Sequence, residues 1–136
     1  MGGMQDTGER FLDTLLRRDF AGLVVHLHPR VQLRALQPGG ALVQMGARPV
    51  VERCESWFGT WDRFTVLSCS TSLIATRLSL AYHLSVSLNG DRREVAHQFF
   101  VDVVDERITV MDLLDSGFLP VPRGASLSRI PDEGEL

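Results

Sequence analysis

The sequence contains no lysine, because all 14 of its basic residues are arginine. Without a lysine amine no Schiff base can form with a carbonyl substrate, so that class of covalent catalysis is excluded. The net charge is −3, whereas a nucleic-acid-binding protein would carry a basic stripe. No apolar run approaches the roughly 20 residues that span a bilayer, and the opening MGGMQDTGERF lacks the apolar stretch of a secretory signal. We therefore expect a cytoplasmic protein that binds neither nucleic acid nor membrane.

Residues that hold metals or form disulfides are also scarce. The two cysteines, Cys54 and Cys69, lack C-x-x-C spacing, so we expect two reduced, buried thiols. His26 and His28 flank Pro29 at a predicted helix end and belong to no H-E-x-x-H grouping. We expect no metal and no cofactor.

Helix signals fill the first half of the chain. Asp6 or Thr7 can cap a first helix, Asp19 can cap a short second helix, and Pro49 suits the first turn of a third. Each segment carries apolar residues at the three- and four-residue spacing of a helix that buries one face.

Strand signals fill the second half. Apolar and small or polar residues alternate, and the Asn89-Gly90 pair is typical of a tight hairpin turn. The predicted long strands are 63–73, 77–88, 93–104 and 107–115, with a shorter pair over 31–35 and 41–45. We expect one α+β domain over 1–118, in which three helices pack on a strongly curved mixed or antiparallel sheet, and a flexible tail over 119–136.

This order of elements resembles the nuclear transport factor two-like superfamily, which includes ketosteroid isomerases, limonene epoxide hydrolases and SnoaL-like polyketide cyclases. The matching segments are LLRRDFAGLVVHLHPRVQL, the helix within 46–61, and FFVDVVDERITVMDLLDSGF. The resemblance implies a cone-shaped α+β barrel with an internal pocket, and it covers about residues 6–118. A fold of this kind hosts many unrelated functions, so function has to be argued from the site.

The catalytic groups of two of these families are missing from the chain. The three isomerase positions fall on or beside Phe11, Ala35 and Phe99, which are apolar and cannot act as base or oxyanion donors. Two positions of the hydrolase Asp-Arg-Asp set fall on His83 and Ser85. The cyclase chemistry asks for less, because it needs only an apolar pocket and one or two proton-transfer groups.

Strand alternation indicates which polar groups could face the pocket. His97 shares a face with Val95 and Phe99, so we expect it to be a pocket acid or base, or alternatively a core histidine bonded to a carbonyl. Tyr82 lies among leucines and valines on the neighbouring strand and could donate a hydrogen bond to a ligand. His83 has the opposite phase and is expected on a solvent or dimer surface.

The last strand offers two aspartates on opposite faces, and alternation does not decide between them. Asp112 or Asp115 is the expected partner of His97; otherwise Asp112 pairs with a surface arginine and Asp115 caps the Ser116-Gly117 turn.

These residues predict a small enzyme for a polyketide-, terpenoid- or steroid-like molecule, a cyclase or isomerase of secondary metabolism that acts by proton transfer. The alternatives are a non-catalytic ligand-binding or dimerisation module, with a homodimer formed through the sheet, and an epoxide hydrolase or epoxide-opening ether cyclase. The expected ligand-contacting residues are apolar or aromatic: Phe11, Leu15, Trp57, Phe58, Trp61, Leu84, Val95, Phe99 and Met111.

Overall fold

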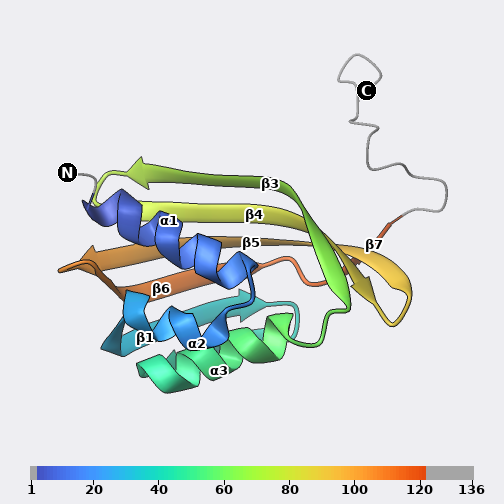
Figure 1. Cartoon of the computed structure of the whole chain (residues 1–136), viewed down its shortest axis with the longest axis horizontal. Helices are drawn as coiled ribbons and strands as arrows, with labels where there is room; N and C mark the ends of the chain where they lie inside the picture. The colour runs from blue at the N-terminus through green and yellow to red at the C-terminus, as the bar shows by residue number, and fades with distance from the viewer. Residues whose placement is uncertain (1–2, 122–136) are drawn as a thin grey trace, which may run out of the picture.

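The computed structural model describes residues 3–121, and within them three helices pack on one face of a seven-stranded sheet (Figure 1). The strand order is β2-β1-β6-β5-β4-β3, with β7 paired to β5. The β1–β6 pair is parallel and the other pairs are antiparallel, so the predicted mixed α+β architecture is confirmed. The elements are α1 (Gly3–Leu16), α2 (Phe20–Leu23), the 3-10 helix η1 (Val24–His26), β1 (Leu27–Gln37), β2 (Gly40–Met45), α3 (Ala47–Phe58), β3 (Arg63–Ile74), β4 (Arg77–Leu88), β5 (Asp91–Val104), β6 (Arg107–Asp115) and β7 (Leu119–Pro120).

The four long strands lie within two residues of their predicted bounds. Asn89 and Gly90 both have positive φ, as the tight turn between β4 and β5 requires. The turn between β5 and β6 holds Asp105 and Glu106 at positive φ as well, although neither is glycine. Strand β7 lies just beyond the predicted domain end at residue 118, and the predicted tail lies outside the described residues from 122 onward.

The first helix begins earlier than Asp6 or Thr7, which corrects the predicted cap. Thr7 lies inside α1, where its hydroxyl donates to the carbonyl of Gly3 at 2.9 Å. Asp19 does cap α2, since its side chain accepts a hydrogen bond from the Gly22 amide at 3.0 Å. Gly8 brings α1 close to the sheet: a Cβ built there would lie 2.1 Å from Cδ2 of Leu78.

The space between helices and sheet is filled by side chains. Phe58 of α3 is fully buried and its ring lies 4.5 Å from that of Trp61 and 6.1 Å from that of Tyr82, centroid to centroid. Phe11 and Phe99 meet edge to face at 6.1 Å. The expected roomy interior is therefore a packed aromatic core, because large rings stand where a hollow barrel would need small residues.

Burial also distinguishes the two cysteines. Cys54 is buried in the core, and burial raises the pKa of its thiol to about 12. Cys69 is exposed on β3, so the prediction of two buried thiols is wrong for this residue. No helix within residues 3–121 is long and apolar enough to span a membrane.

Candidate functional site

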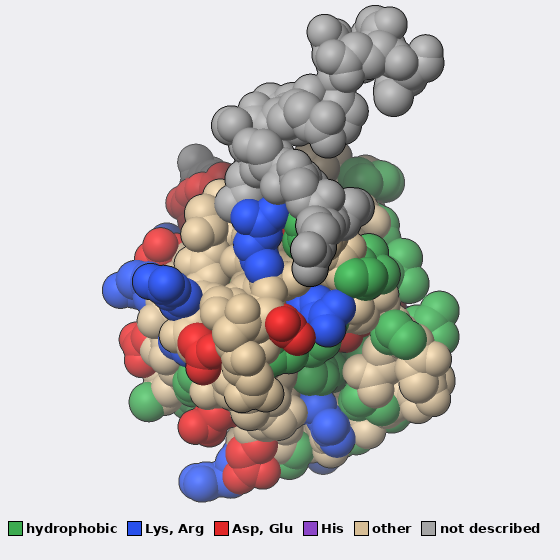
Figure 2. All heavy atoms as spheres, turned by 90° about the vertical axis from the view of Figure 1, so that its right-hand side faces the viewer, with side chains coloured by type: hydrophobic (Ala, Val, Ile, Leu, Met, Phe, Trp, Pro, Cys, Tyr) green, Lys and Arg blue, Asp and Glu red, His purple; other side chains and the backbone are tan. Residues whose placement is uncertain are grey.

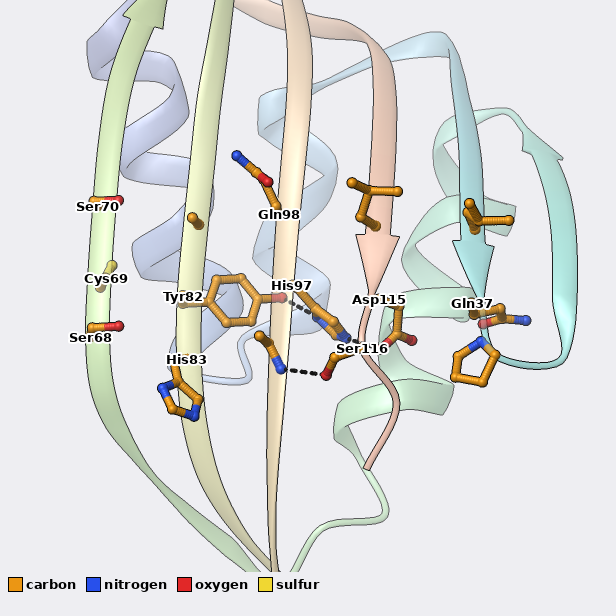
Figure 3. A pocket seen from close by; sticks show the side chains of 15 residues that line it. Gln37, Ser68, Cys69, Ser70, Tyr82, His83, His97, Gln98, Asp115 and Ser116 are labelled. Carbon is orange, nitrogen blue, oxygen red and sulfur yellow. Dashed lines mark hydrogen bonds and ion pairs between the residues drawn. The ribbon is translucent and has the colours of Figure 1, made fainter. Parts of the chain in front are cut away.

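Three polar side chains form a hydrogen-bonded chain on the helix-facing side of the sheet. Tyr82, His97 and Asp115 are direct cross-strand neighbours on β4, β5 and β6. The Tyr82 hydroxyl lies 2.7 Å from Nδ1 of His97, and Nε2 of His97 lies 3.2 Å from Oδ1 of Asp115 (Figure 3). Strand register therefore assembles the chain, because residues opposite each other on adjacent strands project to the same side.

This chain of contacts is almost sealed from solvent. Tyr82 is 2% exposed and His97 is 3% exposed, and the Trp57 and Phe58 rings lie about 6.0 and 5.9 Å from the imidazole. Both imidazole nitrogens have polar partners, so the alternative of a carbonyl-bonded core histidine does not describe His97. The buried ring satisfies its hydrogen bonds entirely through Tyr82 and Asp115.

The electrostatics of the site favour an ionised aspartate and a neutral phenol. Burial by itself would raise the pKa of Asp115, but the hydrogen bond and attraction of His97, together with a hydrogen bond from the Gly117 amide at 2.8 Å, lower that pKa below its usual value. Burial raises the pKa of Tyr82 well above 10. An ionised Asp115 can only accept, so Nε2 of His97 carries a proton toward it and Nδ1 is free to accept from Tyr82.

The outer end of this chain opens into a small mouth pocket. The mouth pocket lies between the end of α3 and the ends of β5 and β6, and its volume is about 120 Å³. Its walls include Trp57, Thr60, Trp61, His97, Asp115 and Phe118. A molecule in this pocket can therefore contact His97 and Asp115, whereas the Tyr82 hydroxyl is hydrogen bonded to His97.

Asp112 lies on the opposite face of the sheet from His97, three residues before Asp115 and in the opposite phase. Arg34 donates to both of its carboxylate oxygens at 2.6 and 2.8 Å, and Arg77 donates to Oδ2 at 2.9 Å. The hydrogen bond from Arg34 is the main reason that the pKa of Asp112 is lowered. Asp112 is therefore paired with surface arginines, which is one of the two alternatives that the sequence leaves open. Of the two candidate aspartates, only Asp115 contacts His97.

The expected ligand-contacting residues divide into two groups. Trp57, Trp61 and Val95 line the mouth pocket. The other six are fully buried at 0% exposure and belong to the aromatic and aliphatic core: Phe11, Leu15, Phe58, Leu84, Phe99 and Met111. Three of them lie on helices and three on strands, and they pack against one another in the core between the two layers.

His83 lies on the outer face of the sheet, as its phase predicts, and its Nε2 lies 2.7 Å from Oε1 of Glu94. Beside it runs a second, open hollow of about 730 Å³, the outer groove. Residues of the outer groove include Leu36, Ser68, Ala81, His83, Gln98 and Leu114, and Tyr82, His97 and Asp115 are also among its lining residues; the helices lie behind the sheet (Figure 3).

Sequence reasoning missed four residues that line the mouth pocket: Ser56, Thr60, Gly117 and Phe118. Thr60 falls within the predicted helix but follows the end of α3 at Phe58, and Phe118 stands where the strand pattern stops. The sequence did offer one signal that the residues after Asp115 lie near its carboxylate, the Asp115-Ser116-Gly117 turn. An aspartate that caps a turn holds the next residues of that turn close to its own side chain.

Comparison with solved structures identifies the fold. A steroid delta-isomerase from Pseudomonas aeruginosa is 20% identical with a TM-score of 0.62, over 85% of this chain and 80% of that one. An LEH-like epoxide hydrolase from M. tuberculosis is 16% identical with a TM-score of 0.65, over 84% and 82%. A nuclear transport factor two-like protein from Burkholderia xenovorans LB400 is 11% identical with a TM-score of 0.67, over 85% and 91%.

The chain therefore has the nuclear transport factor two-like fold. No protein-family model matches the sequence, and no curated protein matches it.

The lowered pKa of Asp115 predicts a specific pH dependence of stability. A carboxyl whose pKa is lower in the folded state contributes stability above its unfolded pKa, near 3.9, and that contribution is lost as the pH falls through the folded value. We expect the stability difference between wild type and Asp115→Asn to be constant from about pH 5 to 7 and to shrink below about pH 4. Urea unfolding across this range measures it, and a difference that grows toward low pH would contradict the lowered pKa of Asp115.

Proposed function

We propose that this protein is an enzyme that moves a proton within an apolar carbonyl compound, as a cyclase or isomerase. The observation that carries the proposal is the partly buried carboxylate of Asp115, oriented by His97 and Gly117 at the wall of the mouth pocket. A carboxylate with a lowered pKa is ionised near neutral pH and can accept a proton from a molecule held against it.

The proposed reaction uses Asp115 as the proton acceptor. Oδ1 is engaged by His97 and Gly117, whereas Oδ2 has no hydrogen bond within residues 3–121. Oδ2 takes a proton from the carbon next to the substrate carbonyl, and the C–H electron pair moves into the enolate. In an isomerisation the same carboxyl returns the proton to another carbon of the enolate. In a cyclisation the enolate carbon attacks a second carbonyl carbon of the substrate, the C=O π electrons move to its oxygen, and the carboxyl returns the proton to that alkoxide, so atoms and electrons balance without an oxidant or reductant.

His97 acts in this proposal through Asp115. Its Nε2–H stabilises the carboxylate in one orientation, and the Tyr82 hydroxyl fixes the imidazole tautomer from the other side. His97 and Tyr82 are therefore positioning residues, and Asp115 is the catalytic residue.

The size of the mouth pocket restricts the substrate. Sites for drug-sized ligands usually enclose about 300–1,000 Å³, so a pocket of about 120 Å³ encloses only the reacting end of a molecule. A polyketide-, terpenoid- or steroid-like compound would insert its carbonyl end past Trp57 and Phe118 and leave the remainder outside. The cytoplasmic location and the place in secondary metabolism stay predictions of the sequence.

Deuterium exchange tests this function without knowledge of the natural substrate. The protein is incubated in D₂O with a panel of cyclic and polycyclic ketones, and loss of the α-proton signals is followed by NMR. The proposal expects exchange faster than in buffer for at least one ketone. Exchange at the buffer rate for the whole panel would remove the basis for a proton-transfer enzyme.

An epoxide-opening reaction is supported less well. It would need two carboxyl groups in one cavity, and among residues 3–121 the mouth pocket has a single acidic residue, Asp115.

The outer face of the sheet favours a second role, as the contact surface of a homodimer. Leu36, Val43 and Leu114 rise from β1, β2 and β6 with exposures of 56%, 58% and 49%. Leu36 and Leu114 form part of the lining of the outer groove, together with small residues such as Ala81 and Ala96. Figure 2, an end view of the molecule, shows hydrophobic side chains gathered along one flank and charged side chains along the other. A ridge and a groove on the same face can fill each other when two copies pack about a two-fold axis.

A Leu36→Arg variant is expected to be monomeric at protein concentrations where the wild type is a dimer, because the new charge would be desolvated at the interface. Leu36 is exposed, so the fold should tolerate the change. The matched control is Val25→Arg, since Val25 is 63% exposed but lies in η1 on the helix side. Sedimentation equilibrium separates the cases; a monomeric wild type, or a dimer that survives Leu36→Arg, would contradict this interface.

A further inference from the structure

Trp61 carries a buried hydrogen-bond donor that nothing in the described chain satisfies. Its side chain is 3% exposed, and Nε1 has no acceptor among residues 3–121. An indole N–H removed from water without an acceptor is costly, and most buried donors in folded proteins are paired. Such a donor calls for an explanation in terms of what it binds.

Within the described residues, the side chains packed directly on the Trp61 ring are aromatic. Its ring packs against three phenylalanine rings, Phe58 at 4.5 Å, Phe64 at 5.7 Å and Phe118 at 5.9 Å. The backbone carbonyl of Trp61 accepts a hydrogen bond from the Arg18 guanidinium at 2.8 Å, which fixes the backbone at this residue. The rigid setting means that the indole cannot easily turn toward a partner elsewhere in the core.

Trp61 is also a wall of the mouth pocket, which it shares with Asp115. Of the three phenylalanines around it, Phe118 is the exposed one, at 44%, and it follows Gly117, whose φ is +74°. Because it is exposed, Phe118 can move away from Trp61 at a smaller packing cost than the buried Phe58. The residue with the unpaired donor and the carboxylate acceptor thus line the same pocket.

We propose that the indole N–H of Trp61 holds the carbonyl oxygen of the ligand in the mouth pocket. The inference rests on the proposed function and specifies its substrate as a compound with a carbonyl at the inserted end. When Asp115 removes a proton from the adjacent carbon, negative charge develops on that oxygen, and the preorganised N–H stabilises it. A hydrocarbon end of the same shape would leave the donor unpaired and bind more weakly.

The test uses ¹⁵N-labelled protein and cyclohexanone as the probe. The two indole N–H signals are assigned with Trp57→Phe and Trp61→Phe, and the Gly117 amide, which is bonded to Asp115, reports on occupancy of the pocket. We expect cyclohexanone to move the Trp61 indole signal downfield and to shift Gly117. Trp61→Phe should weaken binding about 5- to 10-fold, which is the effect of one lost hydrogen bond. Val25→Ala, a change at an exposed residue outside the mouth pocket, should alter binding less than about twofold.

The possible failures are distinguishable. A shift of Gly117 without a shift of the Trp61 indole, or equal affinities of wild type and Trp61→Phe, overturns the role of Trp61 and leaves the mouth site standing. An indole N–H that is already hydrogen bonded before ketone is added also overturns it. No shift of either signal at millimolar ketone overturns this inference and counts against the mouth site itself.

Discussion

An Asp115→Asn variant is expected to lose about 100- to 10,000-fold in the rate of ketone α-proton exchange, the contribution typical of a positioned general base. Asparagine has nearly the same shape, and its Oδ1 can still accept from His97 and Gly117, so the site should stay folded. What it lacks is a carboxylate able to take the proton. The exchange assay in D₂O measures the loss directly.

The matched control is Asp112→Asn, the same substitution three residues earlier on the other face. It breaks charge pairs with Arg34 and Arg77 and should reduce stability, but it should leave the exchange rate unchanged. Equal losses of activity in the two variants would mean that the effect comes from folding, and no loss in Asp115→Asn would move the base elsewhere.

His97 can be separated from Asp115 by a conservative pair of variants. His97→Gln keeps an N–H that can reach Asp115, whereas His97→Ala removes the donor and leaves the buried carboxylate without its ring partner. If His97 acts by positioning Asp115, His97→Gln should recover part of the exchange rate that His97→Ala loses. The acid limb of the pH–rate profile should also lie at different pH values in the two variants.

The largest expected effect on stability is that of Phe58→Ala, at about 3–5 kcal/mol. Phe58 is fully buried, and its ring contacts Trp61, Tyr82 and His97, so its removal opens a cavity under the site. The free energy of unfolding in urea measures the cost. Val25→Ala is the control, because Val25 is 63% exposed and its truncation should change stability by no more than about 0.5 kcal/mol. Similar values for the two variants would contradict a packed interior.

Period-two alternation explains why so much of the sheet could be predicted from sequence. Tyr82 and His97 were placed on the buried faces of their strands because their neighbours at i ± 2 are apolar, and the structure confirms both placements. The choice between Asp112 and Asp115 could not be made in this way. It depends on how β6 pairs with β5 and with the distant β1, and a pattern within one strand does not encode that register.

For a related reason, the sequence could not show that side chains fill the interior between helices and sheet. Phe11 and Phe99 have the right phase for a pocket wall, but whether two such rings face a void or each other depends on the distance between α1 and β5. Gly8 is one determinant of that distance, since it lets α1 approach Leu78. The Arg34–Asp112–Arg77 contacts were likewise hidden, because the three residues are joined only by sheet pairing.

The most direct test of the whole account is the protonation of the His97 ring, read from the ¹⁵N shifts of its two nitrogens at neutral pH. The account predicts that Nε2 carries a proton and donates it to Asp115, and that Nδ1 accepts a hydrogen bond from Tyr82. A proton on Nδ1 with a bare Nε2, or a ring in free exchange with solvent, would contradict the buried chain on which the proposed chemistry depends.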